Sequence, residues 1–226
     1  MSALIVSCGR TGTNMLLETL RATKELTATS IAEDKQVFRR GSITKNYLSK
    51  TDTVYIDNLR QVKNLLDSEK ELKILWTIRD LRDCAMSKIY RGQPGNDCNG
   101  ISDDATFQGC LDDIVWMQTI HHYIKENYPD RIFLVRLENM LNDFEGTVKS
   151  VCKFIGIEYI DDMKNFTSRY RNNFQARRYK GLDKKQFEMY KRRDEVYNGF
   201  FKTHDIDLDL LFVNLIPCLN HFGYSI

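Results

Sequence analysis

Residues 2–14, SALIVSCGRTGTN, decide the fold of this chain. The stretch from Ala3 to Ser7 is short and apolar, which predicts a buried β-strand. A polar turn with two glycines follows, and from about Asn14 to Lys24 leucines recur on one helical face. A strand, a glycine loop and a helix in this order predict the start of a right-handed βαβ unit.

The same alternation continues along the chain. We predict further strands at residues 53–56, 73–78 and 131–136. We predict helices at residues 59–68, 82–90 and 147–155, and a longer one from residue 104 or 105 to just before Pro129. This pattern indicates an α/β fold of three layers, α/β/α, around a central parallel sheet. Ligands bind such sheets at the carboxyl ends of the strands, here just after Ser7, Ile56, Ile78 and Arg136.

The bulk composition narrows the class of protein. With 226 residues, 42% of them hydrophobic and 28% charged, the chain is typical of a globular protein, and one domain spanning residues 1–226 is the simplest prediction. A net charge of +2 does not indicate a nucleic-acid partner. No signal peptide or membrane span is evident, and the six cysteines are scattered, so we expect a cytoplasmic protein with reduced thiols. No histidine has metal-ligand spacing, so no metal is expected.

The glycine loop after the first strand predicts an anion site. Gly12, like Gly9, allows a tight turn, and the backbone amides of residues 11–14 would lie at a helix N-terminus. Arg10 adds a full charge, while three neutral side chains add donors: Thr11, Thr13 and Asn14. The Walker A motif and the GxGxxG fingerprint are both absent. A glycine turn without a ligand is the alternative.

A second anion site is predicted after the strand at residues 73–78. Arg79 closes that strand, and Ser87 follows eight residues later on the next helix. The two side chains could hold a phosphate at some distance from the first loop. The alternative is that Arg79 pairs with Asp80 or Asp83 while Ser87 faces solvent.

Together these motifs resemble the sulfotransferases that use 3′-phosphoadenosine 5′-phosphosulfate (PAPS). Residues 10–14 resemble the family's 5′-phosphosulfate loop, and Arg79 with Ser87 resembles its 3′-phosphate motif, although Leu81 stands where the family usually has proline. Residues 133–140 and 144–156 match the family more weakly. The resemblance covers about residues 4–156 and implies a fold like that of the P-loop NTPases.

The resemblance implies in-line transfer of a sulfuryl group from PAPS to a hydroxyl or amine of an unidentified small-molecule or glycan acceptor, with 3′-phosphoadenosine 5′-phosphate (PAP) as product and no metal. Arg10 would hold the leaving 5′-phosphate. The family closes a basic C-terminal segment over the 3′-phosphate, and a similar segment here carries Arg177, Arg178, Lys180 and Gly181. The fuller Lys-Gly-x-x-Gly pattern is missing, and a solvated basic face is the alternative.

The general base is the weakest part of the resemblance. One branch of the family uses a histidine about twenty residues before the 3′-phosphate arginine, and this region has none; Asp57 could substitute. Other branches use a glutamate after the first helix, where Glu33 and Asp34 lie. We rank Glu33 ahead of Asp57, while either one could be an ordinary surface carboxylate.

Two other functions remain open at this point. One is a P-loop nucleotide kinase or NTPase, against which the missing Walker lysine argues. The other is an inactive homologue that binds PAPS or PAP but lacks a base.

Overall fold

The computed structural model describes residues 1–29, 33–92, 107–166 and 208–225. Its contacts divide the chain into two compact units. We call Met1–Arg79 with Val115–Thr167 the sheet unit, and Asp80–Ile114 with Ser168–Ile226 the helical unit. The organisation of residues 1–226 as one domain stays a prediction.

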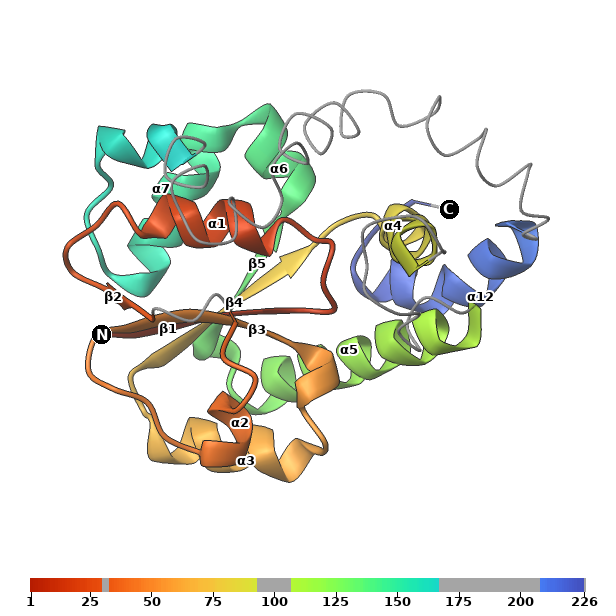
Figure 1. The fold of residues 1–226 in the computed structure, drawn as a ribbon, viewed down its shortest axis with the longest axis horizontal. Helices are drawn as coiled ribbons and strands as arrows, with labels where there is room; N and C mark the ends of the chain where they lie inside the picture. Colours follow the sequence, from red (N-terminus) through yellow and green to blue (C-terminus); the bar gives the residue numbers. More distant parts are fainter. Residues whose placement is uncertain (30–32, 93–106, 167–207, 226) are drawn as a thin grey trace. The chain divides into compact units, whose positions relative to one another are not determined.

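The sheet unit is built on a five-stranded parallel sheet with strand order β2-β3-β1-β4-β5 (Figure 1). In the central pairs, Ile5 of β1 lies opposite Lys50 of β3 and Leu75 of β4. The predicted α/β class with a parallel sheet is confirmed. The strands are β1 Ser2–Ser7, β2 Thr27–Ala28, β3 Tyr47–Asp52, β4 Leu72–Ile78 and β5 Ile132–Arg136.

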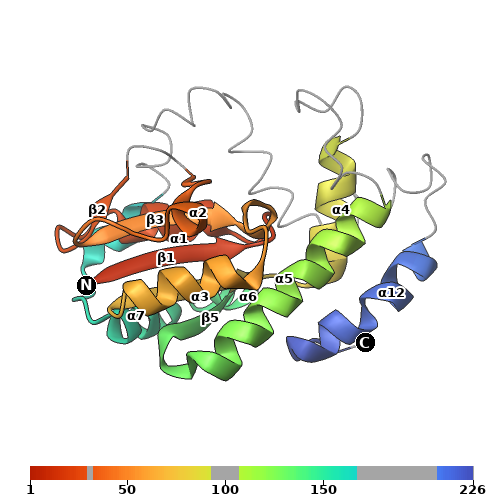
Figure 2. The same cartoon turned by 90° about the horizontal axis from the view of Figure 1, so that it is seen from below.

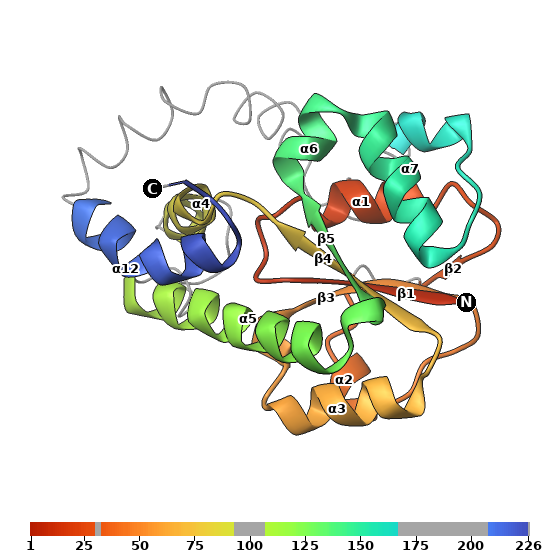
Figure 3. The same ribbon diagram turned by 180° about the vertical axis from the view of Figure 1, so that it is seen from behind.

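Helices cover both faces of this sheet (Figures 1 and 3). On one face lie α1 Thr13–Leu20, α6 Leu137–Asn142 and α7 Phe144–Ile155, and on the other lie α2 Val37–Arg40 and α3 Leu59–Ser68. One apolar cluster joins the first face to the helices, with residues 16, 17 and 20 of α1 and residues 148, 151, 152 and 155 of α7 buried as predicted.

The helix α5, Phe107–Asn127, begins in the helical unit and ends in the sheet unit. Its sheet-unit part lies on the same side of the sheet as α3 (Figure 2). There the His121 ring meets Trp76 of β4 edge-on, with centroids 5.2 Å apart. The sheet therefore has an apolar layer on each face, as expected for a parallel sheet.

The described part of the helical unit contains α4 Leu81–Gly92, the start of α5, and α12 Leu208–His221. A buried ion pair joins α4 to α5, between Lys88 and Asp113, whose side chains are 3% and 5% exposed. The helices α4 and α12 are in contact.

The predicted strand at residues 53–56 is wrong. The strand is β3, Tyr47–Asp52, and residues 53–55 form a single 3-10 turn that begins where the Asp52 side chain accepts a bond from Val54 N at 3.4 Å. The sequence YLSKTD was missed because its second half is polar, yet Ser49, Lys50 and Thr51 are all buried. The ligand-binding edge therefore follows Asp52 rather than Ile56.

The other predicted elements are present. The helix at residues 59–68 has the predicted bounds, while α1 ends at Leu20 rather than near Lys24. The short elements β2 and α2 had no periodic signal to predict them. Within the described residues, the cysteines at 8, 84, 110, 152 and 218 are thiols rather than disulfides, and no helix is long and apolar enough to cross a membrane.

Candidate active site

The loop between β1 and α1 adopts a left-handed backbone at three of four successive positions. The φ angles are 77° at Gly9, 60° at Arg10 and 85° at Gly12. A Cβ atom on Gly9 would lie 2.8 Å from Asp52 Oδ2, and one on Gly12 would lie 2.6 Å from Leu137 Cδ1. Only glycine fits both positions. A strained Arg10 held between two such glycines is typical of a functional site.

The loop leads directly into the N-terminus of α1. Gly12 is the N-cap, no described side chain caps the first turn, and that turn carries no acidic residue. The positive end of the helix dipole is therefore available to an anion. Asn14 adds a buried side-chain oxygen that no described residue bonds. Because the oxygen and nitrogen of an amide are interchangeable in assignment, Asn14 offers a ligand either an acceptor or a donor.

A buried hydrogen bond ties this loop to the strand that ends at the second predicted site. The hydroxyls of Thr11 and Thr77 lie 2.7 Å apart, and both residues are almost fully buried. Thr77 is the penultimate residue of β4, and Arg79 directly follows the strand. The structure thus fixes the loop against the strand that carries Arg79 to the edge of the sheet.

Arg79 and Ser87 fall in different units. Arg79 is the last residue of the first sheet-unit segment, and it is 5% exposed. Ser87 is on α4 in the helical unit and is 2% exposed, so the alternative in which Ser87 faces solvent is wrong. The Arg82 guanidinium donates a bidentate pair of hydrogen bonds to the Asp80 carboxylate, from Nε to Oδ1 at 3.0 Å and from Nη2 to Oδ2 at 2.7 Å. The phosphate site formed by Arg79 and Ser87 stays a prediction.

Glu33 lies beside a buried lysine that sequence reasoning missed. Lys50 on β3 is 8% exposed, and its Nζ lies 3.6 Å from Glu33 Oε1. Leu48 packs in the apolar cluster that contains α1, and residues two apart on a strand share a face. The Lys50 ammonium is therefore on the α1 side of the sheet, as is the glycine loop.

Asp52 is a second missed residue. It ends β3 opposite Ser7 of β1, and its Oδ2 lies against the backbone of Gly9. The alternation that places Lys50 on the α1 side places Asp52 there too. Positions 48, 50 and 52 are Leu, Lys and Asp, so no apolar period of two marks this face of the strand in the sequence.

Asp57 is held differently from Glu33. Arg39 donates to both of its carboxylate oxygens, at 2.8 and 3.0 Å, and Gln61 donates to Oδ2 at 2.8 Å. The hydrogen bond from Arg39, followed by that from Gln61, holds the pKa of Asp57 below its ordinary value. A carboxylate with both oxygens bonded and a lowered pKa is poorly suited to accept a proton, so Asp57 ranks behind Glu33 as a base.

The remaining predicted residues lie outside the described part of the chain: Arg177, Arg178, Lys180 and Gly181. Among residues 1–29, 33–92, 107–166 and 208–225, no group of three His, Cys, Asp or Glu side chains could hold a metal ion.

Comparison with known proteins decides the family. The family model described as "Sulfotransferase domain" matches residues 2–205. The chain belongs to the sulfotransferase family. The predicted family is thus confirmed, and with it the assignment to the sulfotransferase enzymes rather than to the nucleotide kinases.

Solved sulfotransferases share the fold. The mouse sulfotransferase SULT7A1, determined with PAP, is 18% identical, with a TM-score of 0.53 over 75% of this chain; the match covers 64% of the mouse chain. A sulfotransferase from Alicyclobacillus acidocaldarius is 13% identical, with a TM-score of 0.51 over 80% of this chain and 94% of its own. A sequence search among curated proteins finds no match.

Proposed function

We propose that this chain transfers a sulfuryl group from PAPS to a hydroxyl or amine of a small-molecule or glycan acceptor. One observation carries the proposal: a strained loop with Arg10 at its centre opens onto the N-terminus of α1, at the carboxyl edge of a parallel sheet. The sulfotransferase family of the chain gives that anion site its chemistry.

The loop would stabilise the leaving group. In sulfuryl transfer the sulfur–oxygen bond to the 5′-phosphate breaks, and negative charge accumulates on the phosphate oxygen. Arg10 and the backbone amides at the start of α1 would bind that charge, and Asn14 would supply a further polar contact. Lys50, on the same side of the sheet, would offset charge on the transferring group.

Arg79 and Ser87 would bind the 3′-phosphate, together with the cations among residues 177–180. The strands that precede the two proposed sites, β1 and β4, are neighbours in the sheet, which supports this division. A nucleotide with phosphates at its 3′ and 5′ ends would use both sites, whereas ATP would use one.

We assign the general base to Glu33. Its one described ion pair, with Lys50, is longer than a hydrogen bond, so its carboxylate can turn to an acceptor hydroxyl. Asp52 is the second candidate, because its carboxylate lies so near the loop that a Cβ on Gly9 would be 2.8 Å from Oδ2. Asp57 is the third.

Turnover with radiolabelled PAPS tests the proposal and its inactive alternative. The protein is incubated with PAPS carrying labelled sulfur and a panel of phenols, sugars and amines, and labelled products are separated. Transfer to one class, lost in Arg10→Ala, supports the proposal. Binding of PAP with no transfer to any member, and no release of sulfate to water, would instead establish the inactive homologue.

A further inference from the structure

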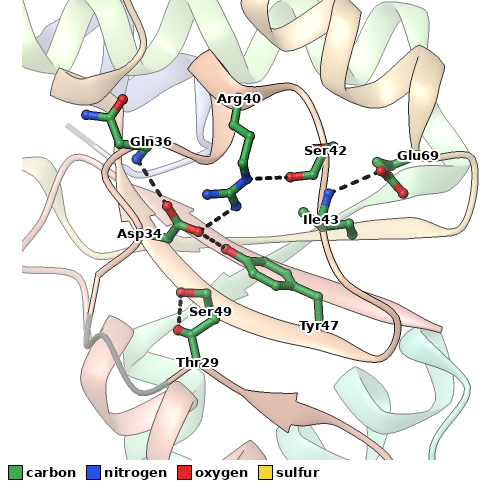
Figure 4. A network of polar contacts seen from close by, with 9 residues as sticks. All are labelled: Thr29, Asp34, Gln36, Arg40, Ser42, Ile43, Tyr47, Ser49 and Glu69. Carbon is green, nitrogen blue, oxygen red and sulfur yellow. Dashed lines mark hydrogen bonds and ion pairs between the residues drawn. The ribbon is translucent and has the colours of Figure 1, made fainter.

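Resting on the proposed function, we propose that Asp34 is a positioning residue that holds the neighbouring Glu33 beside Lys50. Figure 4 shows the network on which the proposal stands, with Asp34 at its centre. Of two adjacent carboxylates, one anchors the chain and the other is presented to the reaction.

Asp34 is fastened to β3 through both its main chain and its side chain. Its backbone N donates to Lys50 O at 2.8 Å. Its Oδ2 accepts from Tyr47 OH at 2.8 Å and from Arg40 Nη2 at 2.9 Å, while Oδ1 accepts from Gln36 N at 3.1 Å (Figure 4). Both carboxylate oxygens are therefore occupied, and the residue after Glu33 cannot shift without breaking four bonds.

The charge states of Asp34 and Tyr47 preserve these hydrogen bonds near neutral pH. Burial raises the pKa of Asp34, but hydrogen bonds from Arg40, Tyr47 and Gln36 N outweigh burial and leave that pKa below its ordinary value. Burial first, and then the Asp34 carboxylate, raise the pKa of Tyr47, which stays a hydroxyl donor. Asp34 thus remains an ionised acceptor with no oxygen free for proton transfer.

Glu33 differs from its neighbour in each of these respects. Its side chain is 27% exposed, against 12% for Asp34, and its one described ion pair is the 3.6 Å approach to Lys50. Four residues earlier, the chain is also held on β3, since Thr29 N donates to Leu48 O and the Thr29 hydroxyl meets that of Ser49 at 3.0 Å. Glu33 is thus loosely bonded itself and is followed by a firmly held residue, as a reacting carboxylate needs to be.

The same segment offers a matched control at its other end. Ile43 N donates to Glu69 Oε1 at 3.1 Å, which is again a carboxylate holding the segment in place. Glu69 has no described contact with residue 33 or 50. Loss of this anchor should disturb the segment without moving Glu33.

The test measures the reactivity of Lys50, which needs neither acceptor nor turnover. Lys50 is labelled with acetic anhydride at pH 8 and quantified by mass spectrometry, in wild type, Glu33→Gln, Asp34→Asn, Tyr47→Phe and Glu69→Ala. Because the Glu33 carboxylate lies 3.6 Å from the Lys50 ammonium, its removal or displacement leaves the amine less protected from the reagent and raises its labelling above that of wild type. We expect Asp34→Asn to match Glu33→Gln, Tyr47→Phe to rise less, and Glu69→Ala to match wild type.

The double variant Glu33→Gln/Asp34→Asn shows whether Asp34 affects Lys50 by positioning Glu33 or independently of Glu33. If Asp34 acts through Glu33, the double variant labels like Glu33→Gln alone. A further rise in the double variant, or wild-type labelling in both Asp34→Asn and Tyr47→Phe, overturns the proposal. PAP binding, measured separately, must be unchanged in Asp34→Asn; absence of PAP binding in wild type would refute the proposed function and leave the labelling result to stand alone.

Discussion

The loop at residues 8–14 follows the carboxyl end of β1, and the segment at residues 33–43 begins beside Lys50 on the neighbouring strand β3, yet the two are constructed in opposite ways. The loop is a backbone site, made by glycines, positive φ angles and a helix terminus. The segment is a side-chain site, in which Asp34, Arg40 and Tyr47 hold one another across 13 residues of sequence. A site made by the backbone is determined by a short local sequence motif. A site made by side chains from distant segments forms only when the strands have assembled. We therefore expect changes in the loop to impair nucleotide binding, and changes around the segment to impair turnover.

The largest effect is expected from Glu33→Gln, which removes the proposed base and keeps the shape of the side chain. General-base catalysis contributes roughly 10²–10⁴-fold, so kcat should fall by about that factor while PAP affinity is retained. Steady-state turnover of PAPS measures this, with Asp57→Asn expected near wild type. If Asp52→Asn or Asp57→Asn loses activity while Glu33→Gln keeps it, the base has been misassigned.

Arg10→Ala should show the opposite pattern. Hydrogen bonds to charged groups contribute about 1.5–3 kcal/mol, so PAP affinity should fall roughly 10–100-fold. Isothermal titration calorimetry measures the change, with Arg39→Ala as a surface control of the same charge. Unchanged PAP affinity in Arg10→Ala would remove the loop from the nucleotide site.

Thr77→Val tests the tie between the loop and β4. The substitution keeps the side-chain shape but leaves the buried Thr11 hydroxyl without its 2.7 Å partner. We expect a loss of about 1–2 kcal/mol in the free energy of unfolding, with PAP binding weakened further. Urea denaturation measures the first quantity. A variant as stable as wild type would show that the loop does not depend on this bond.

The smallest expected effect is on the pH dependence of folding stability in Asp34→Asn. Its pKa is lowered in the folded protein, so its carboxylate stabilises the fold above its unfolded pKa of about 3.9, and that contribution is lost as the pH falls. The stability gap between wild type and Asp34→Asn, about 1 kcal/mol at pH 7, should narrow as the pH falls below the unfolded pKa and through the lower pKa of the folded state. Urea denaturation at each pH measures it, and a gap that stays constant would contradict the lowered pKa.

The features made by local sequence could be predicted, and those made by contacts between distant segments could not. The glycine loop, the strand before Arg79 and the helix at residues 59–68 were predictable because local periodicity and glycine geometry determine them. Strand β3 was misplaced because Lys50 is buried inside it, and no periodicity rule expects a charged residue there.

The roles of neighbouring carboxylates could not be separated by sequence either. Asp34, Glu33 and Asp57 all look like exposed acids in the sequence. The partners that distinguish them, such as Tyr47 and Arg39, become visible only when distant segments meet.

Thermal unfolding with PAP, and in parallel with AMP, ADP and ATP, tests the central claim of a two-phosphate nucleotide site most directly. A ligand at about 100 times its Kd stabilises a protein by roughly 2.7 kcal/mol. For a domain of this size that is a rise in Tm of about 5–11 °C. The account predicts a rise of this size with PAP and little with the other three nucleotides. A rise with ATP instead, or none with any nucleotide, would contradict it.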